Sequence, residues 1–215
     1  MRVDLHVHIK RRSNCALHQP DQMADKAGRR GIQGIVLLDH HYYPTKEEIE
    51  QTQAKFPKVR LFRGIEITFV GEDKKNDDIV VIGDDLSDLN IDRRLPVNPG
   101  LSQLANYLKN KKALTILCHP FRRHDDVVID FDILTPDCVE IASRNTPKKK
   151  RKEIYKLAKK YGMRMVSTSD AHKDGHLGNQ CIDLLSNVSN EVELINAVKS
   201  YEYVLLEKKL APVSF

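Results

Sequence analysis

Histidines and carboxylates recur in short clusters along this chain, and these residue types together bind transition metals. The clearest clusters are residues 4–8 (DLHVH), 39–41 (DHH) and 170–172 (DAH). Side chains two positions apart on a β-strand point to the same face, so His6 and His8 can hold one ion together. Imidazole nitrogens with carboxylate oxygens are the ligand set of zinc, manganese or iron, and a carboxylate can bridge two such ions. The pattern predicts a metal centre.

Three further candidates lie in or after apolar runs that are typical of strands. They are Glu66, His119 and Glu140. In parallel α/β folds, functional residues gather at the carboxyl ends of strands, and in a closed barrel those ends meet at one mouth. A single histidine at a strand end is more often a hydrogen-bonded structural residue than a ligand. Six strand candidates that carry such residues favour one shared site over chance placement.

The elements that must position these residues are short β-branched runs alternating with amphipathic helices. The predicted strands are residues 3–7, 34–38, 59–65, 79–82, 114–118, 138–142, 164–167 and 203–206. Apolar residues at helical spacing predict helices over 101–108, 154–161 and 192–198, and Thr45 with Glu48 forms a capping box that begins another. The polar stretch 71–78 is interpreted as a loop, with a hairpin as the alternative.

This rhythm predicts an α/β fold with mainly parallel strands joined by helical crossovers. An open sheet would satisfy it as well, but the metal-binding residue types at the strand ends favour a barrel. The length of 215 residues suits one sizeable core, so we expect a single domain over 1–215.

Composition narrows the functional class. The chain is 40% hydrophobic and 30% charged, which is typical of a folded globular protein, and no apolar run is long enough to cross a bilayer. The start of the chain leaves no room for a signal peptide, and its four cysteines form no CxxC pair, so we expect a cytoplasmic protein with reduced thiols. The net charge of +5 suits an anionic substrate. The basic run 148–152 is interpreted as solvated first turns of a helix rather than a nucleic-acid contact.

Five stretches of this chain, DLHVH, LLDHH, GIEIT, LCHPFR and STSDAH, resemble the successive motifs of the PHP (polymerase and histidinol phosphatase) family, in that family's order and over nearly the whole chain. The resemblance implies a distorted seven-stranded, TIM-like (β/α)7 barrel that holds two or three divalent metal ions. Family members mostly hydrolyse phosphate esters, as histidinol phosphatases, nucleotide phosphatases, exonucleases and domains of bacterial DNA polymerases do. A metal-dependent phosphoesterase acting on a nucleotide or another small phosphomonoester is therefore expected.

The resemblance also implies a ligand set. The residues that would bind metal are His6, His8, Glu66 and Asp170 at a first ion, Glu66 and His119 at a second, and His40 and His172 at a third. Two departures affect it. Residues 78–83 lack the histidine that many members place there, which weakens the second site. After the first motif, where members carry an Asp or His, this chain offers residues 13–15 (SNC) and then His18, a possible extra ligand if the loop folds back.

Other residues are expected to contact substrate or to support the ligands. Arg122 and Arg144 are the candidates for binding the substrate phosphate, and His176 is a candidate substrate contact. Asp39 and Glu140 are expected to orient ligating histidines. His41 and His124 are not expected to bind metal.

Two rival functions remain open at this point. The first is a metal-dependent exonuclease acting on nucleic-acid ends, for which the adjacent Tyr42 and Tyr43 are the only aromatic indication. The second is a non-catalytic, nucleic-acid-associated accessory barrel, which degenerate metal motifs would support.

Overall fold

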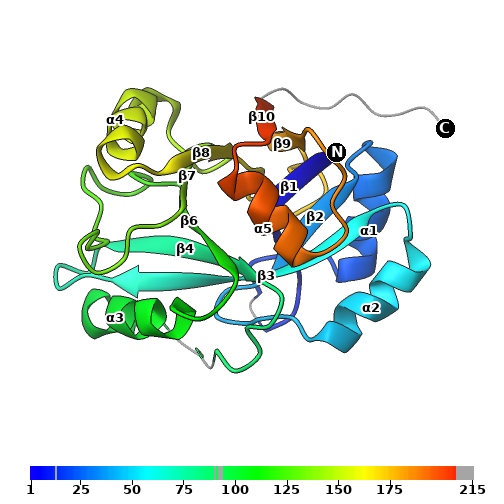
Figure 1. The fold of residues 1–215 in the computed structure, drawn as a ribbon, viewed down its shortest axis with the longest axis horizontal. Coiled ribbons are helices and arrows are strands. Elements are labelled where there is room, and N and C mark those ends of the chain that lie inside the picture. The colour runs from blue at the N-terminus through cyan, green and yellow to red at the C-terminus, as the bar shows by residue number, and fades with distance from the viewer. Residues whose placement is uncertain (13, 90, 92–93, 207–215) are drawn as a thin grey trace.

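The computed structural model describes residues 1–12, 14–89, 91 and 94–206. These form a single α/β domain built on one mixed sheet (Figure 1). Its strands are β1 (Arg2–His8), β2 (Gly34–Leu38), β3 (Arg60–Val70), β4 (Asn76–Gly83), β5 (Leu95–Pro96), β6 (Ala113–Cys118), β7 (Cys138–Ala142), β8 (Arg164–Ser167), β9 (Cys181–Leu184) and β10 (Tyr203–Leu206). Its helices are α1 (Pro20–Arg29), α2 (Lys46–Lys55), α3 (Val97–Leu108), the 3₁₀ turn η1 (Lys148–Lys150), α4 (Arg151–Tyr161) and α5 (Glu191–Lys199).

The sheet curls into a nearly closed barrel, which confirms the predicted fold class. The strand order is β10-β9-β1-β2-β3-β4-β6-β7-β8, with the short β5 attached to β3. The chain beyond β8 returns to β1, where the backbone N–H of His8 donates to the Ala171 carbonyl at 2.9 Å and the N–H of Ala171 donates to the His6 carbonyl at 3.1 Å. These bonds join the last barrel strand to the first.

The sheet is less parallel than the sequence pattern suggests. Strands β1, β2 and β3 run parallel, as do β6, β7 and β8, but β4 lies antiparallel between β3 and β6. Strands β9 and β10 extend the sheet beyond β1 as an antiparallel pair. Helix α1 and strands β5 and β9 were not predicted. Of the two interpretations of 71–78, the hairpin is the correct one, and the antiparallel pairing lengthens β3 through Val70.

Apolar side chains fill the barrel below its polar end. Inward residues of β1, β3, β4 and β6, such as Leu5, Phe62, Val80 and Ile116, belong to one buried cluster. Helix α5 adds Leu194 and its neighbours to the same cluster and so closes the end at which the parallel strands begin. We call the opposite end, where the parallel strands finish, the barrel mouth.

Helices cover the outside of the barrel in two groups (Figure 1). Helices α1 and α2 bury Met23 and Ile49 over the outer faces of β1 and β2. Helices α3 and α4 bury Leu104 and Ile154 over β3, β4, β6 and β7. The capping box that begins α2 is confirmed, because the Thr45 hydroxyl accepts the N–H of Glu48 at 3.2 Å. The basic run 148–152 lies in η1 and the first residues of α4.

A buried ion pair ties α5 to β3. One Glu191 carboxylate oxygen accepts the backbone N–H of Arg63 at 3.1 Å and lies 3.5 Å from its Nε. The guanidinium of Arg63 also donates to the Asp84 carbonyl. Burial raises the pKa of Glu191 even though Arg63 opposes that shift.

We therefore expect Glu191→Ala to lower the free energy of unfolding by about 2 kcal/mol, because it leaves buried donors of Arg63 without an acceptor. Glu191→Gln keeps an acceptor and should cost less than half as much. Urea denaturation of both variants, with exposed Glu202→Ala as a control expected within about 0.5 kcal/mol of the parent, measures the difference. Equal losses in the Ala and Gln variants would contradict this account of the pair.

Candidate metal centre

A β-bulge in β1 brings His6 and His8 to the barrel mouth. Asp4 pairs with Ile35 and Val7 pairs with Leu37, so β1 has one residue more than β2 between these points. The extra residue lets Leu5 stay in the interior cluster while His6 and His8 both point into the mouth. Their Nε2 atoms lie 3.0 Å apart. The sequence-based expectation that these rings share a face agrees with this geometry.

The Glu66 carboxylate lies at the centre of the mouth, surrounded by imidazole nitrogens. Its Oε1 is 3.5 Å from Nε2 of His6 and 3.4 Å from Nε2 of His119. Its Oε2 is 3.2 Å from Nε2 of His8 and 2.9 Å from Nδ1 of His40. Glu66 lies inside β3 rather than at its end, and the neighbouring β4 holds it within the sheet.

His119 and Asp170 reach the mouth through unusual backbone conformations. Their φ angles are +29° and +49°, a region that non-glycine residues rarely adopt and that costs about 1–3 kcal/mol each. The backbone N–H of His119 is held by Glu140 Oε2 at 2.7 Å. Asp170 Oδ1 lies 3.5 Å from Nε2 of His8 and 3.3 Å from Nδ1 of His172. Such strain is typical of residues held in place for a functional site.

Candidate ligands that the sequence analysis did not assign also lie at the mouth, with Asp78, Cys15 and Cys118 among them. Asp78 is at the start of β4, and its Oδ2 is 3.8 Å from Nε2 of His119. Because β4 runs antiparallel, its amino end lies at the mouth. The rule used for the sequence expects functional residues only at the carboxyl ends of strands, so it passes over Asp78. Cys15 lies in the loop after β1, with its Sγ 3.6 Å from Nδ1 of His8.

The donor set fits divalent cations. Both oxygens of Glu66, and Oδ1 of Asp78 and of Asp170, are buried without a hydrogen bond of acceptable geometry from the described residues. An uncompensated buried carboxylate is costly. Four groups of donors, each with its atoms within 4.8 Å of one another, lie at the mouth: His6, His8 and Asp170; Glu66, Asp78 and His119; His8, Cys15, His40 and His172; and His6, Glu66 and Cys118.

Buried carboxylates behind these residues hold them in position. Glu140 accepts Nδ1 of His6 at 2.8 Å and the Thr168 hydroxyl at 2.5 Å. Asp39 accepts the backbone N–H of His40 at 2.8 Å and that of Arg12 at 2.9 Å. Glu140 therefore contacts the ring of His6, and Asp39 contacts the backbone of His40; the orienting roles expected for both stay predictions.

The charges at the mouth are strongly coupled. Burial alone would lower the pKa of His40, but the charge of Glu66 and the contact with Cys15 raise it to about 11. Burial would likewise raise the pKa of the Cys15 thiol, yet contacts with His172, His40 and His8 lower it to about 3. Burial opposes ionisation of Glu66, and the surrounding His40, His6 and His8 nevertheless hold its pKa well below the ordinary value. Charged histidines and the ionised forms of Glu66 and Cys15 therefore favour one another at the mouth.

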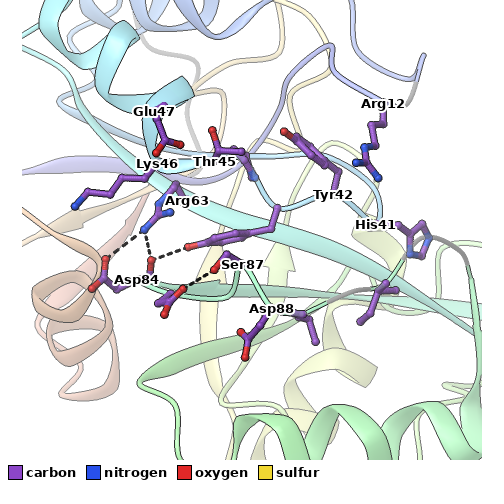
Figure 2. A pocket seen from close by; sticks show the side chains of 15 residues that line it. Arg12, His41, Tyr42, Thr45, Lys46, Glu47, Arg63, Asp84, Ser87 and Asp88 are labelled. Atoms are coloured by element: carbon purple, nitrogen blue, oxygen red, sulfur yellow. Dashed lines mark hydrogen bonds and ion pairs between the residues drawn. The ribbon is translucent and has the colours of Figure 1, made fainter.

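One pocket opens onto this centre, and a second adjoins the first. The first, of about 500 Å³, lies over the candidate ligands and is lined by Cys15, His40, His172 and three arginines, Arg94, Arg122 and Arg123. We call it the mouth pocket. The second, of about 770 Å³, shares His41 with it, and we call it the side pocket. Figure 2 shows Arg12, Tyr42 and His41 gathered at one end of the side pocket, and Arg63 and Asp84 at the other.

Several residues with expected roles lie outside the candidate ligand groups. His18 lies 3.6 Å from Asp174, and Cys15 occupies the position beside His8. Arg144 is exposed and does not line the mouth pocket. His176 is partly buried near Arg144, which together with burial lowers its pKa. His124 lies 2.9 Å from the Asn76 carbonyl, and neither it nor His41 belongs to a group of donors.

Comparison with known proteins identifies the fold. The sequence matches no protein-family profile and no curated protein. Among solved structures, a candidate metal-dependent phosphoesterase from Bifidobacterium adolescentis is 12% identical, with a TM-score of 0.65 over 91% of this chain and 94% of the other. A two-domain protein from Bacteroides vulgatus, which contains a predicted PHP-like metal-dependent phosphoesterase, is 17% identical, with a TM-score of 0.70 over 96% of this chain and 64% of the other.

A third solved structure is an amidohydrolase from Chromobacterium violaceum with bound sulfate and no metal. It is 16% identical, with a TM-score of 0.60 over 80% of this chain and 88% of the other. At such identities the likeness concerns the fold. None of the helices in the described part of the chain is both long and apolar enough to cross a membrane. The chain therefore has the distorted TIM-like fold of PHP-like metal-dependent phosphoesterases, with buried clusters of His, Asp and Glu at the barrel mouth that can hold metal.

Proposed function

We propose that this protein is a metal-dependent phosphoesterase that hydrolyses a small phosphomonoester. The observation that carries the proposal is the cluster of buried histidines and carboxylates beneath an arginine-lined pocket, in which four carboxylate oxygens lack a hydrogen bond from the described residues. The fold shared with metal-dependent phosphoesterases supports it. Zinc, manganese and iron all suit the donors, and two or three ions would use the groups of donors described above.

The roles of the residues follow from their positions. His6, His8 and Asp170 would hold one ion, Glu66, Asp78 and His119 a second, and His40 and His172 a third. Bound divalent ions supply a water with a lowered pKa and neutralise charge on a phosphoryl group. The side chains of Arg94, Arg122 and Arg123 line the pocket above and can bind phosphoryl oxygens, two at a time for each planar guanidinium. The contact with Glu140 would make Nδ1 of His6 the protonated nitrogen. The Nε2 atom would then carry the lone pair and face the mouth.

The side pocket favours a small leaving group over a nucleic-acid end. Tyr43 is buried and donates its hydroxyl to the Gly83 carbonyl, and the face of the Tyr42 ring is covered by Arg12 at 4.9 Å. Burial of Tyr43 and the guanidinium over Tyr42 limit the ring surface on which a base could stack. The exposed carboxylates of Asp84, Asp85 and Asp88 also line this pocket and would repel a polyanionic backbone. Hydroxyl or amino groups on a leaving group suit such a lining.

The proposed function is tested by phosphate release and by metal-linked stability. A chelator should lower the melting temperature and abolish phosphate release from mononucleotides and other small monoesters, and manganese or zinc should restore both. An ion that binds the folded protein at 100 times its Kd stabilises it by about 2.7 kcal/mol. Asp170→Asn should lose most of this stabilisation, and Asp25→Asn, at a partly buried residue of α1 that pairs with Arg29, should retain it. A melting temperature indifferent to metal, with no ester hydrolysed, would exclude the phosphoesterase. Nucleic-acid binding that survives the chelator would then favour the accessory barrel.

Arg122→Ala should remove about 2–4 kcal/mol of transition-state stabilisation, because it deletes a preorganised donor to the charge that develops on the phosphoryl group. Bound metal, counted by elemental analysis, should stay unchanged. The matched control is Arg29→Ala on the exposed face of α1, which should retain the parental kcat/KM. If the best substrate turns over equally fast in both variants, Arg122 does not bind the phosphate.

A further inference from the structure

Cys15 adds a sulfur donor at the barrel mouth, whereas the residues that would hold metal in the proposed function are carboxylates and imidazoles. Its Sγ lies 3.6 Å from Nδ1 of His8, and it shares a group of donors with His40 and His172, in which all donor atoms are within 4.8 Å. The rings of His8 and His172 are stacked at 4.1 Å, and that of His40 lies 4.8 Å from His8. One sulfur and three nitrogens therefore converge at the edge of the mouth.

The loop that carries Cys15 is fastened across the mouth by backbone hydrogen bonds. The N–H of Lys10 donates to the His18 carbonyl at 2.8 Å, that of Arg12 donates to Asp39 Oδ2 at 2.9 Å, and that of Leu17 donates to the His172 carbonyl at 3.0 Å. The last two bonds attach the loop to segments that also carry candidate ligands. Cys15 is therefore presented to the histidines by a folded loop.

Buried carboxylate oxygens aimed at the same histidines point independently to a cation here. Glu66 Oε2 lies 2.9 Å from Nδ1 of His40, and Asp170 Oδ1 lies 3.3 Å from Nδ1 of His172. Both side chains are about 1% exposed, and neither oxygen has a hydrogen bond of acceptable geometry from the described residues. The edge of the mouth thus combines a soft sulfur donor and three imidazoles with adjacent negative charge.

We propose that Cys15, with His40 and His172, forms a thiolate–imidazole site that selects zinc over manganese, next to a carboxylate-rich site that does not. Thiolates favour zinc and other soft or borderline ions, whereas carboxylates suit manganese and magnesium. The group formed by Glu66, Asp78 and His119 has two carboxylates for each imidazole. On binding, the Cys15 thiolate and the deprotonated imidazole nitrogens form bonds to zinc, and the protons that the imidazoles carried pass to solvent.

Cobalt(II) reports this bond directly, because sulfur coordination adds a ligand-to-metal charge-transfer band in the near ultraviolet. The metal-free full-length chain titrated with cobalt should develop this band. Cys15→Ser should lose it, while Cys118→Ser and Cys181→Ser should keep it. Cys118 is the necessary control, since it belongs to another group of donors with His6 and Glu66. No band in the parent protein, or a band that survives in Cys15→Ser and disappears in Cys118→Ser, would overturn the proposal.

Metal selectivity gives a second readout that does not depend on hydrolysis. Competition with a chromophoric chelator should show zinc affinity at the tightest site falling at least about 100-fold in Cys15→Ser, the upper end of what losing a supporting hydrogen bond costs. Cys15→Asp, with an oxygen donor, should lower the ratio of zinc to manganese affinity. An unchanged ratio in both variants would overturn the proposal. It rests on the proposed function only in placing metal at the mouth: if no metal binds, both fail, whereas phosphate release without the sulfur band contradicts the Cys15 site alone.

Discussion

The Glu66 carboxylate lies buried at the centre of the barrel mouth among His6, His8, His40 and His119, and neither oxygen has a hydrogen bond of acceptable geometry from the described residues. Burying such a group is costly, and the charges of the surrounding histidines favour its ionised form here. Much of the structure serves to keep these groups together: the bulge of β1, the positive φ angles of His119 and Asp170, and the Glu140 carboxylate behind them. The apolar barrel below and α5 beneath it supply the stability that offsets this cost.

Much of the barrel could be predicted because its strands are β-branched and its helices are periodic. Strands β2, β7, β8 and β10 occupy the residues expected for them, and α2 begins at its capping box. The predicted strand boundaries are wrong where polar residues lie within the sheet. The first residues of β4, Asn76 to Asp78, look like a loop in the sequence because they are polar, although all three pair with β3 and Asp78 also pairs with β6. Residues 60–70 form one long strand, of which the sequence pattern predicted only the first part, as a strand over residues 59–65.

The candidate site was predictable to the extent that it follows the rule of parallel strand ends. His6, His8, His119 and Asp170 meet as that rule requires. Asp78 does not follow it, because an antiparallel strand brings its amino end to the mouth, and no local feature of the sequence reveals strand direction. Cys15 was not predicted as a ligand for a different reason. A loop residue can reach the site only if distant backbone groups, such as the His172 carbonyl, hold the loop in place. Asp78 lies in residues 78–83, the stretch that lacks the expected histidine. Its carboxylate is therefore a candidate ligand where other members have an imidazole.

The central claim is that divalent cations compensate the buried carboxylates at the mouth. Diffraction from crystals grown with zinc, recorded on both sides of its absorption edge, tests it most directly. The account predicts anomalous peaks at the mouth in contact with Glu66, His6, His8 and Asp170, and their loss from this position in Glu66→Gln crystals. A mouth without an anomalous peak at saturating zinc, with these side chains turned away from one another, would contradict it.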